Sequence, residues 1–211
     1  MTPAAGVAAK APEAIAQLPL IGDRAWFDRS AAEVAPDLLG AVLIHDTPLG
    51  RIAGRIVEVE AYLGPEDLAA HSSHGQTARN GVMFGSPGHL YVYLVYGLHH
   101  CANVVCGPGT KPEAVLLRAA ELTQGEGLAR ARRGQVPSVR LAAGPGNLAS
   151  AFGIDRRHNG IDLLAGPVRL LRGRRPEAIE RTPRIGVDYA GAWADRPLRY
   201  TIRDDPHRSR R

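Results

Sequence analysis

The sequence contains only two cysteines, Cys101 and Cys106, and no long apolar run. Two thiols are too few for a four-thiolate metal site and do not indicate a secreted disulfide framework, so we expect a reducing compartment, the cytoplasm of a bacterial-type cell. No stretch approaches the ~20 apolar residues of a membrane span. Residues 1–19 are rich in Ala and Pro without a contiguous apolar segment, so they are not typical of a secretory signal and predict a disordered tail.

Lysine is equally scarce, because only Lys10 and Lys111 accompany 24 arginines. The sequence pI of about 9.6 favours a polyanionic partner. Residues 1–129 hold 8 basic and 13 acidic side chains, whereas residues 130–211 hold 18 basic and 8 acidic ones. The second part is therefore a candidate for contacts with phosphate groups, although a solvated, arginine-rich surface would have the same composition.

The length of 211 residues and the hydrophobic content of 45% suit one domain, which we place at residues 20–204, followed by a polar tail at 205–211. Helices are predicted at residues 30–39, 127–133 and 146–152. Strands are predicted at residues 41–45, 54–62, 89–96, 102–106, 115–119, 161–171 and 197–203. Short links between strands favour an α+β fold, with a curved and mostly antiparallel sheet, peripheral helices and a protruding β-hairpin.

The stretch 55–103 concentrates carboxylates, histidines and tyrosines. Alternation along residues 56–62 predicts one face with Ile56, Glu58, Glu60 and Tyr62 and a core face with Val57, Val59 and Ala61. Farther along, Tyr93 and Tyr96 have opposite parity, so they cannot serve the same wall. One of them can line a pocket, while the other, beside Gly97, stands at the tip of a hairpin.

A metal site is a possible reading of His71 with His74 and of the run His99-His100-Cys101. Adjacent residues on a strand point to opposite faces, so the run is poorly placed to converge on one ion. We therefore expect no metal.

Several motifs follow one another in this sequence: EAYLGPED, AAHS, MF..PG.LYVY..YG...C.N, VLLRA.E and PRIGV.YAG.WA..PLRY. In their order and spacing, from about Trp26 to Arg203, the chain closely resembles the alkyladenine (3-methyladenine) DNA glycosylase family. The resemblance implies a monofunctional enzyme of base-excision repair that acts without a cofactor. Its expected substrates are alkylated or deaminated purines of the 3-methyladenine, 7-methylguanine, hypoxanthine and ethenoadenine class, flipped out of the DNA duplex.

The resemblance also implies a catalytic set. Glu60 matches the general base that takes a proton from the water attacking the sugar C1′, and Arg118 matches a residue that helps to hold this water. The backbone carbonyl near Ile185 matches a third ligand of the water. A lyase step would need a Schiff-base amine, and the folded region offers only Lys111 for it.

For base recognition, the resemblance implies that Tyr62, His71 and Tyr93 stack against the extruded base and that Tyr96 wedges into the duplex. Asn103 matches a position that opposes the 2-amino group of guanine. A tyrosine that stands alone is more often ordinary packing, and an asparagine beside a turn more often caps backbone groups. The expected partner is double-stranded DNA with damaged purines, bound by a monomer associated with the nucleoid.

Two other functions remain open from the residues alone. A carbohydrate glycosidase would use Glu58 and Glu60 as an acid and base pair, which neighbours two apart on one strand do badly. A non-catalytic nucleic-acid-binding module would keep the arginines and tyrosines but would need neither Glu60 nor Arg118. Glu58 itself either raises the pKa of Glu60 by like-charge repulsion or forms an ion pair with an arginine, and we assign it no catalytic role.

Overall fold

The computed structural model describes residues 15–109 and 111–209. Of the predicted N-terminal tail, residues 1–14 lie outside this range. The described part contacts the domain: Ile15, in the short 3₁₀ helix η1 (Ile15–Gln17), and Leu18 pack against a small apolar cluster that includes Leu171. The Arg172 N–H donates to the carbonyl of Pro19 at 2.8 Å. Residues 15–19 therefore lie against the sheet.

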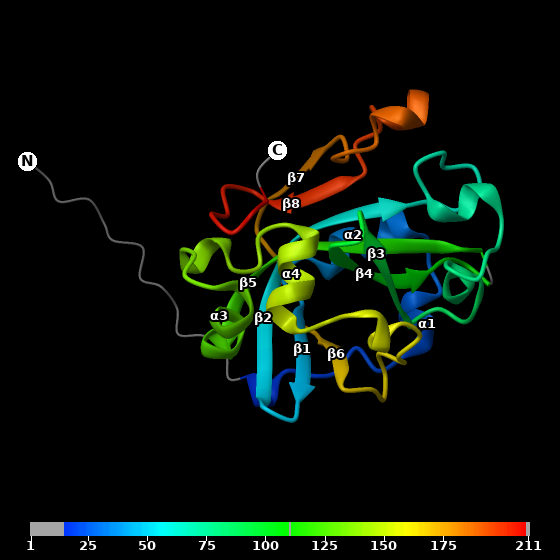
Figure 1. Ribbon diagram of the computed structural model, residues 1–211. Helices are drawn as coiled ribbons and strands as arrows, with labels where there is room; N and C mark the ends of the chain where they lie inside the picture. Colours follow the sequence, from blue (N-terminus) through cyan, green and yellow to red (C-terminus); the bar gives the residue numbers. More distant parts are fainter. Residues whose placement is uncertain (1–14, 110, 210–211) are drawn as a thin grey trace, which may run out of the picture.

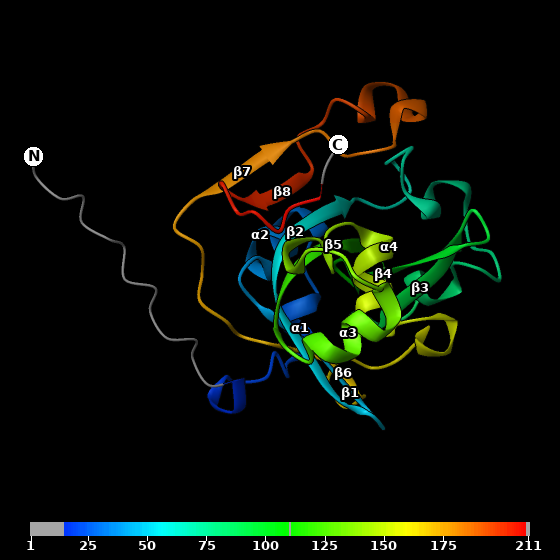
Figure 2. The same cartoon turned by 60° about the vertical axis from the view of Figure 1, so that its left-hand side comes forward.

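An antiparallel sheet forms the body of the protein, and within the described residues it has eight strands (Figure 1). The main path runs β3-β4-β5-β2-β1-β6, and β8 pairs with β2 and with β7. The strands are β1 (Val42–Thr47), β2 (Gly50–Tyr62), β3 (Leu90–Val95), β4 (His99–Cys106), β5 (Glu113–Gln124), β6 (Val168–Leu171), β7 (Ile179–Thr182) and β8 (Arg199–Ile202). The sheet curls, and helices pack against it (Figure 2), so the predicted α+β fold is confirmed.

Helices cover one face of the sheet. They are α1 (Arg24–Phe27), α2 (Ala31–Leu38), α3 (Glu126–Arg133) and α4 (Pro145–Phe152). Helix α2 begins with a capping box of Ser30 and Glu33, and it packs on β2 and β5. Helix α4 packs on β4 and β5, and α3 packs against α4 and β2. Phe27, Leu117 and Phe152 are fully buried between these layers. The main hydrophobic core therefore lies on the helical face of the sheet.

Strand β2 connects the two parts of the sheet. Its first half pairs with β1, its residues 58–60 pair with β8, and β5 runs along its other edge. The pairing with β5 shifts register between Ile56 and Glu58, and again between Glu58 and Val59. This bulge inserts an extra residue, so Ile56 joins the core cluster that contains Val59 and Ala61. The prediction that Ile56 shares a face with Glu58, and Val57 with Val59, is therefore wrong.

Other boundaries also differ from the predictions. Of the predicted strand 161–171, only β6 forms, because Gly166 closes a turn onto the carbonyl of Asp162 (2.7 Å) and Pro167 has no N–H to donate. Strand β7 was not predicted. No helix in the described part of the chain is long and apolar enough to cross a membrane.

The predicted polar tail at 205–211 is also folded where it is described. The carboxylate of Asp205 is 5% exposed, and the backbone N–H of Ser209 donates to Glu58 on β2. Residues 210 and 211 lie outside the described range. The folded unit thus extends at least to residue 209.

Candidate functional site

The face of the sheet opposite the main core carries the polar and aromatic residues. One row of cross-strand neighbours runs across four strands, from Glu60 on β2 through Leu116 on β5 and Asn103 on β4 to Tyr91 on β3. Because side chains alternate along each strand, further residues two positions away share this face. They are Glu58, Tyr62, Tyr93, Cys101 and Arg118. The predicted catalytic and base-binding positions on these strands are therefore brought to one surface.

Glu58 and Glu60 form a buried ion-pair chain with Arg118. Both carboxylates are 0% exposed; Arg118 Nε lies 2.9 Å from Glu58 Oε1, and its Nη1 lies 3.1 Å from Glu60 Oε2. A second cation, Arg199 on β8, donates from Nε to Glu58 Oε1 at 2.8 Å. Burying an unpaired charge costs several kcal/mol. Two arginines and two carboxylates give this cluster no net formal charge.

Glu60 has two further donors. The backbone N–H of Ile185 donates to Oε1 at 2.8 Å, and the Tyr62 hydroxyl donates to Oε2 at 3.1 Å. The Ile185 segment is fixed by its neighbour Arg184, which forms a fully buried ion pair with Asp67 and donates to the carbonyl of Ala61 at 2.9 Å. Ile185 thus contacts the site through its N–H, and the role of its carbonyl as a water ligand stays a prediction.

The two carboxylates are shifted in opposite directions. Burial raises the pKa of Glu60, and Arg118, the Ile185 N–H and Tyr62 only partly offset this effect. Burial also opposes the charge of Glu58, but Arg118 and Arg199 outweigh it and hold the pKa of Glu58 below its usual range. Carboxylates with divergent pKa values serve different roles in many active sites. Glu58 is a fixed anion here, whereas Glu60 can exchange a proton at a milder pH.

Two of the three predicted base-stacking residues form an aromatic wall. His71, in η2 (His71–His74), has its ring centre 4.4 Å from that of Tyr93, and its Nδ1 lies 2.9 Å from the hydroxyl of Tyr91. Burial and the nearby Arg79 lower the pKa of His71, so its imidazole is neutral at pH 7. Tyr62 instead contacts the carboxylate cluster, because its hydroxyl donates to Glu60 and its ring lies beside the guanidinium of Arg184.

Tyr96 and Asn103 occupy contrasting positions. Tyr96 is 92% exposed between β3 and β4, with φ of 50°, a left-handed conformation that is uncommon for residues other than glycine. Asn103 is 4% exposed and donates from Nδ2 to the carbonyl of its cross-strand partner Tyr91 at 3.1 Å. The predicted wedge therefore projects from the hairpin, and the predicted selector is buried in the sheet face that carries Glu60.

Sequence reasoning missed several contributors to this site, among them Tyr91, Arg79 and Arg199. Tyr91 was overlooked although it has the same parity as Tyr93, which was a usable signal. Arg79 places its guanidinium 5.1 Å from the ring centre of Tyr93, and Arg199 binds Glu58 from another strand. The arginine that opens β8 could have been suspected as an ion-pair partner, but its target could not have been named.

No three His, Cys, Asp or Glu side chains of the described residues converge as a metal site would require. His99 and His100 begin β4, where one is exposed and the other half-buried, while Cys101 and Cys106 are buried free thiols. Burial raises the pKa of the Cys101 thiol.

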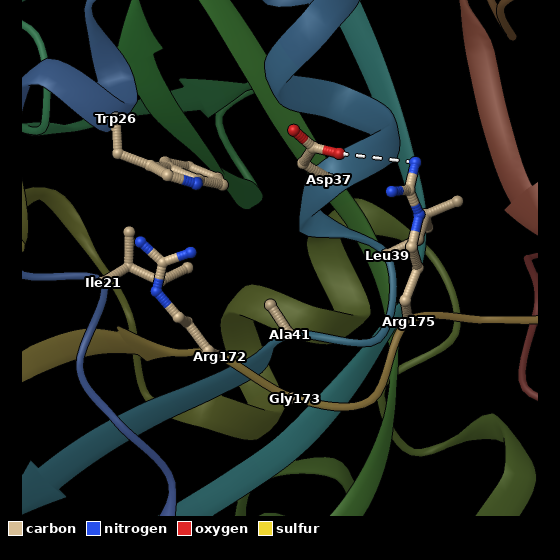
Figure 3. Close-up of a pocket in the computed structure, with 8 residues that line it drawn as sticks. All are labelled: Ile21, Trp26, Asp37, Leu39, Ala41, Arg172, Gly173 and Arg175. Atoms are coloured by element: carbon tan, nitrogen blue, oxygen red, sulfur yellow. Dashed lines mark ion pairs between the residues drawn. The ribbon is translucent and has the colours of Figure 1, made fainter.

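A separate cavity of about 290 Å³ shares no residue with the carboxylate cluster (Figure 3). It lies between the N-terminal helices and the end of β6, with the ring of Trp26 facing the guanidinium of Arg172. Its one carboxylate, from Asp37, is paired with Arg29 at 3.0 Å and with Arg175 at 3.8 Å. The cavity therefore offers no free carboxylate, and the candidate site remains the sheet face around Glu60.

Comparison with known proteins gives matches over most of the chain. The family described as Methylpurine-DNA glycosylase (MPG) matches residues 25–206. A protein of Streptomyces avermitilis is 49% identical over 189 residues, which are 87% of this chain and 88% of that protein. A protein of Methanocella arvoryzae is 47% identical over 193 residues, covering 89% and 95%. Both are named "Putative 3-methyladenine DNA glycosylase".

The opposite pKa shifts of the two glutamates predict opposite effects of neutral substitutions on stability. The folded protein protonates Glu60 at a higher pH than the unfolded chain does, so stability from this group falls as pH rises through the folded pKa. Glu60→Gln should therefore gain stability relative to the wild type as the pH is raised from about 5 to about 8. Urea unfolding at several pH values measures this difference.

Glu58→Gln is the matched control. The lowered pKa of Glu58 gives stability that is present above the unfolded pKa and is lost as pH falls through the folded pKa. The free energy of unfolding of Glu58→Gln should therefore lie furthest below that of the wild type near neutral pH, and the difference should become smaller in acid. A free energy of unfolding for Glu60→Gln that runs parallel to the wild type at every pH would contradict the raised pKa of Glu60.

Proposed function

The chain belongs to the methylpurine-DNA glycosylase family, and from this we propose that it is a monofunctional DNA glycosylase that hydrolyses the N-glycosidic bond of alkylated or deaminated purines. The observation that carries the proposal is Glu60: a fully buried carboxylate, bonded to Arg118 and to the Ile185 N–H, on the same face as an aromatic wall. A module that only binds nucleic acid would gain nothing from a buried carboxylate with a raised pKa.

In the proposed reaction, ionised Glu60 accepts a proton from a water molecule as the water oxygen bonds to the sugar C1′. The bond from C1′ to the purine nitrogen breaks, and its electron pair leaves with the base. Positive charge develops on the sugar in such reactions, and the carboxylate stabilises it. Arg118 keeps Glu60 ionised and oriented, because its guanidinium contacts both Glu60 and Glu58. The product is an abasic site.

The aromatic residues are proposed to hold the extruded base. Tyr62 contributes one side of the pocket, and His71 with Tyr93 contributes the other. Stacking on aromatic faces offsets part of the cost of unstacking a base from the duplex. A neutral His71 suits this task, because a cationic ring would repel the positively charged bases formed by alkylation. The substrate class proposed is 3-methyladenine, 7-methylguanine, hypoxanthine and ethenoadenine.

The proposed partner is double-stranded DNA. The basic excess of residues 130–211 supports contact with phosphates, and the exposed Tyr96 at the tip of the β3–β4 hairpin supports insertion into a groove. We propose that the protein acts as a monomer in the bacterial-type cytosol, at the nucleoid, where this substrate lies.

Removing the charge of Glu60 should remove most of the activity. Glu60→Gln keeps the shape of the side chain but cannot accept a proton, so single-turnover release of 7-methylguanine should fall by at least the ~10²–10⁴-fold typical of a general base. DNA binding should persist, and a chelator should leave the wild-type rate unchanged. Excision at the wild-type rate by Glu60→Gln would eliminate the proposed mechanism.

Loss of the wedge should matter most where the base is stably paired. Tyr96→Ser should slow excision of hypoxanthine from a duplex, because the flipped state loses part of the few kcal/mol that extrusion costs. The same lesion in single-stranded DNA should be less affected. Leu98→Ala, a 77%-exposed residue of the same hairpin, serves as the control for a general change in this surface. Equal losses of Tyr96→Ser on both substrates would assign Tyr96 to folding.

Asn103 is proposed to oppose the 2-amino group of guanine from the floor of the pocket, where its amide is held by the carbonyl of Tyr91. Asn103→Ala should therefore raise excision of 7-methylguanine and guanine relative to hypoxanthine, by roughly 10-fold if the contact contributes ~1.4 kcal/mol. Single-turnover rates on the three duplexes test this. A parallel fall of all three rates would show instead that Asn103 only supports the hairpin.

A further inference from the structure

The chain after β8 folds back over the carboxylate cluster in a segment that we call the post-β8 turn (residues 203–209). Asp205 anchors it to the middle of β2, because its carboxylate lies 2.7 Å from Arg55 Nη2. The same carboxylate accepts from the His207 N–H within the turn at 3.0 Å. Arg55 also binds Glu121 on β5 at 2.7 Å. The turn is thereby tied to the same two strands that carry Glu60 and Arg118.

Two further contacts hold the turn from its outer side. Arg208 Nη1 lies 2.7 Å from Glu180 on β7, and Arg140 donates to the carbonyl of Arg208 at 3.1 Å. These contacts fix the position of the next residue, Ser209, beside Glu58. Its backbone N–H donates to Glu58 Oε2 at 2.6 Å, and its hydroxyl donates to Oε1 at 2.7 Å.

Ser209 also reaches Arg118. The hydroxyl oxygen that donates to Glu58 lies 3.4 Å from Arg118 Nη2, so it can accept from the same guanidinium that binds Glu60 through Nη1. Glu58 Oε1 thus receives Arg118, Arg199 and Ser209 together, while Oε2 receives the Ser209 N–H. The position of Glu58, and with it the plane of Arg118, depends on these donors.

We propose that Ser209 is a positioning residue of the reaction, which holds Glu58 so that Arg118 stays directed at Glu60. This inference rests on the proposed role of Glu60 as the general base. Without the Ser209 donors, the negative charge of Glu58 is stabilised by fewer hydrogen bonds, so Glu58 draws Arg118 closer to itself. Glu60 then loses part of its counter-charge and is ionised only at a higher pH.

The charged groups that face Glu60 are Glu58, Arg118, Arg199 and Arg184, of which Arg184 is paired with Asp67. Tyr62, Tyr93 and Cys101 face it as titratable groups, but burial raises the pKa of all three, so they stay neutral in the acid range. Burial and Arg79 lower the pKa of His71, which packs against Tyr93 and has no hydrogen bond to Ser209 among the described residues. His207, within the turn, binds Asp205. The wild type and every Ser209 variant contain both histidines. A difference between their pH profiles therefore reports on the Glu58–Arg118–Glu60 chain.

The test is the pH dependence of single-turnover excision of 7-methylguanine from a duplex, from about pH 5 to about pH 8. Ser209→Ala removes the hydroxyl but keeps the N–H, and Ser209→Pro removes both donors. The rising acid limb should move to higher pH in Ser209→Ala, with the rate lowered roughly 3- to 10-fold at the acid end and recovered at the alkaline end. Ser209→Pro should shift the limb further, and Ser209→Thr should restore it.

The chain offers a matched control in Ser138, whose hydroxyl also donates to a carboxylate, that of Glu126 at 2.9 Å on the surface. Ser138→Ala should keep the wild-type profile. A wild-type pH profile in both Ser209→Ala and Ser209→Pro would overturn the proposal. A uniform loss of rate at every pH, without a shift of the acid limb, would also overturn it and would show that the turn only stabilises the fold. Glu60→Gln distinguishes a failure of the proposed function from a failure of this inference. Excision at the wild-type rate by Glu60→Gln refutes the proposed function. An inactive Glu60→Gln, together with Ser209 variants that keep the wild-type pH profile, refutes only the role of Ser209.

Discussion

The burial of two carboxylates around one guanidinium is the constraint on which the rest of this structure depends. Glu58 and Glu60 are completely withdrawn from water, and Arg118 alone cannot supply enough donors for both. The donors that complete the cluster come from Arg199, Ser209, Tyr62 and the Ile185 N–H. Each lies on a different part of the chain except Tyr62, which shares β2 with the two glutamates. The fold can therefore be understood as the arrangement that brings these donors to one place.

The strands of the sheet and two later segments of the chain, which hold Ile185 and Ser209, together supply these donors. The hydrogen-bonded pairing of β2 with β5, and of β5 with β4, fixes Glu60, Arg118 and Asn103 relative to one another. These two segments are each fixed by an ion pair. Arg184 pairs with Asp67 and fixes the segment that carries Ile185, and Arg55 pairs with Asp205 and fixes the segment that carries Ser209. Sites supported by locked neighbours hold their geometry better than sites on free loops. This division leaves Tyr96 exposed on the hairpin while Glu58 and Glu60 are buried.

The sequence carried the fold class and much of this face, but not its long-range contacts. Alternation placed Glu58, Glu60 and Tyr62 together, and the parity of Tyr93 and Tyr96 separated a wall from a hairpin tip. The alternation failed at Ile56, because a bulge depends on the partner strand as well as on the strand itself. The partners of Glu58 could not be predicted for a similar reason, because Arg199 and Ser209 are distant from it in sequence. A serine in a polar segment also has no feature that marks it as a hydrogen-bond donor to a buried carboxylate.

The central claim is that one environment drives Glu58 and Glu60 in opposite directions, leaving only Glu60 able to exchange a proton. The most direct measurement is a ¹³C NMR titration of the protein labelled at the glutamate side-chain carboxyls, with the two signals assigned by their absence in Glu58→Gln and Glu60→Gln. The account predicts that Glu60 titrates above the usual range of a glutamate and Glu58 below it. Two signals that titrate together in the usual range, or in the reverse order, would contradict it.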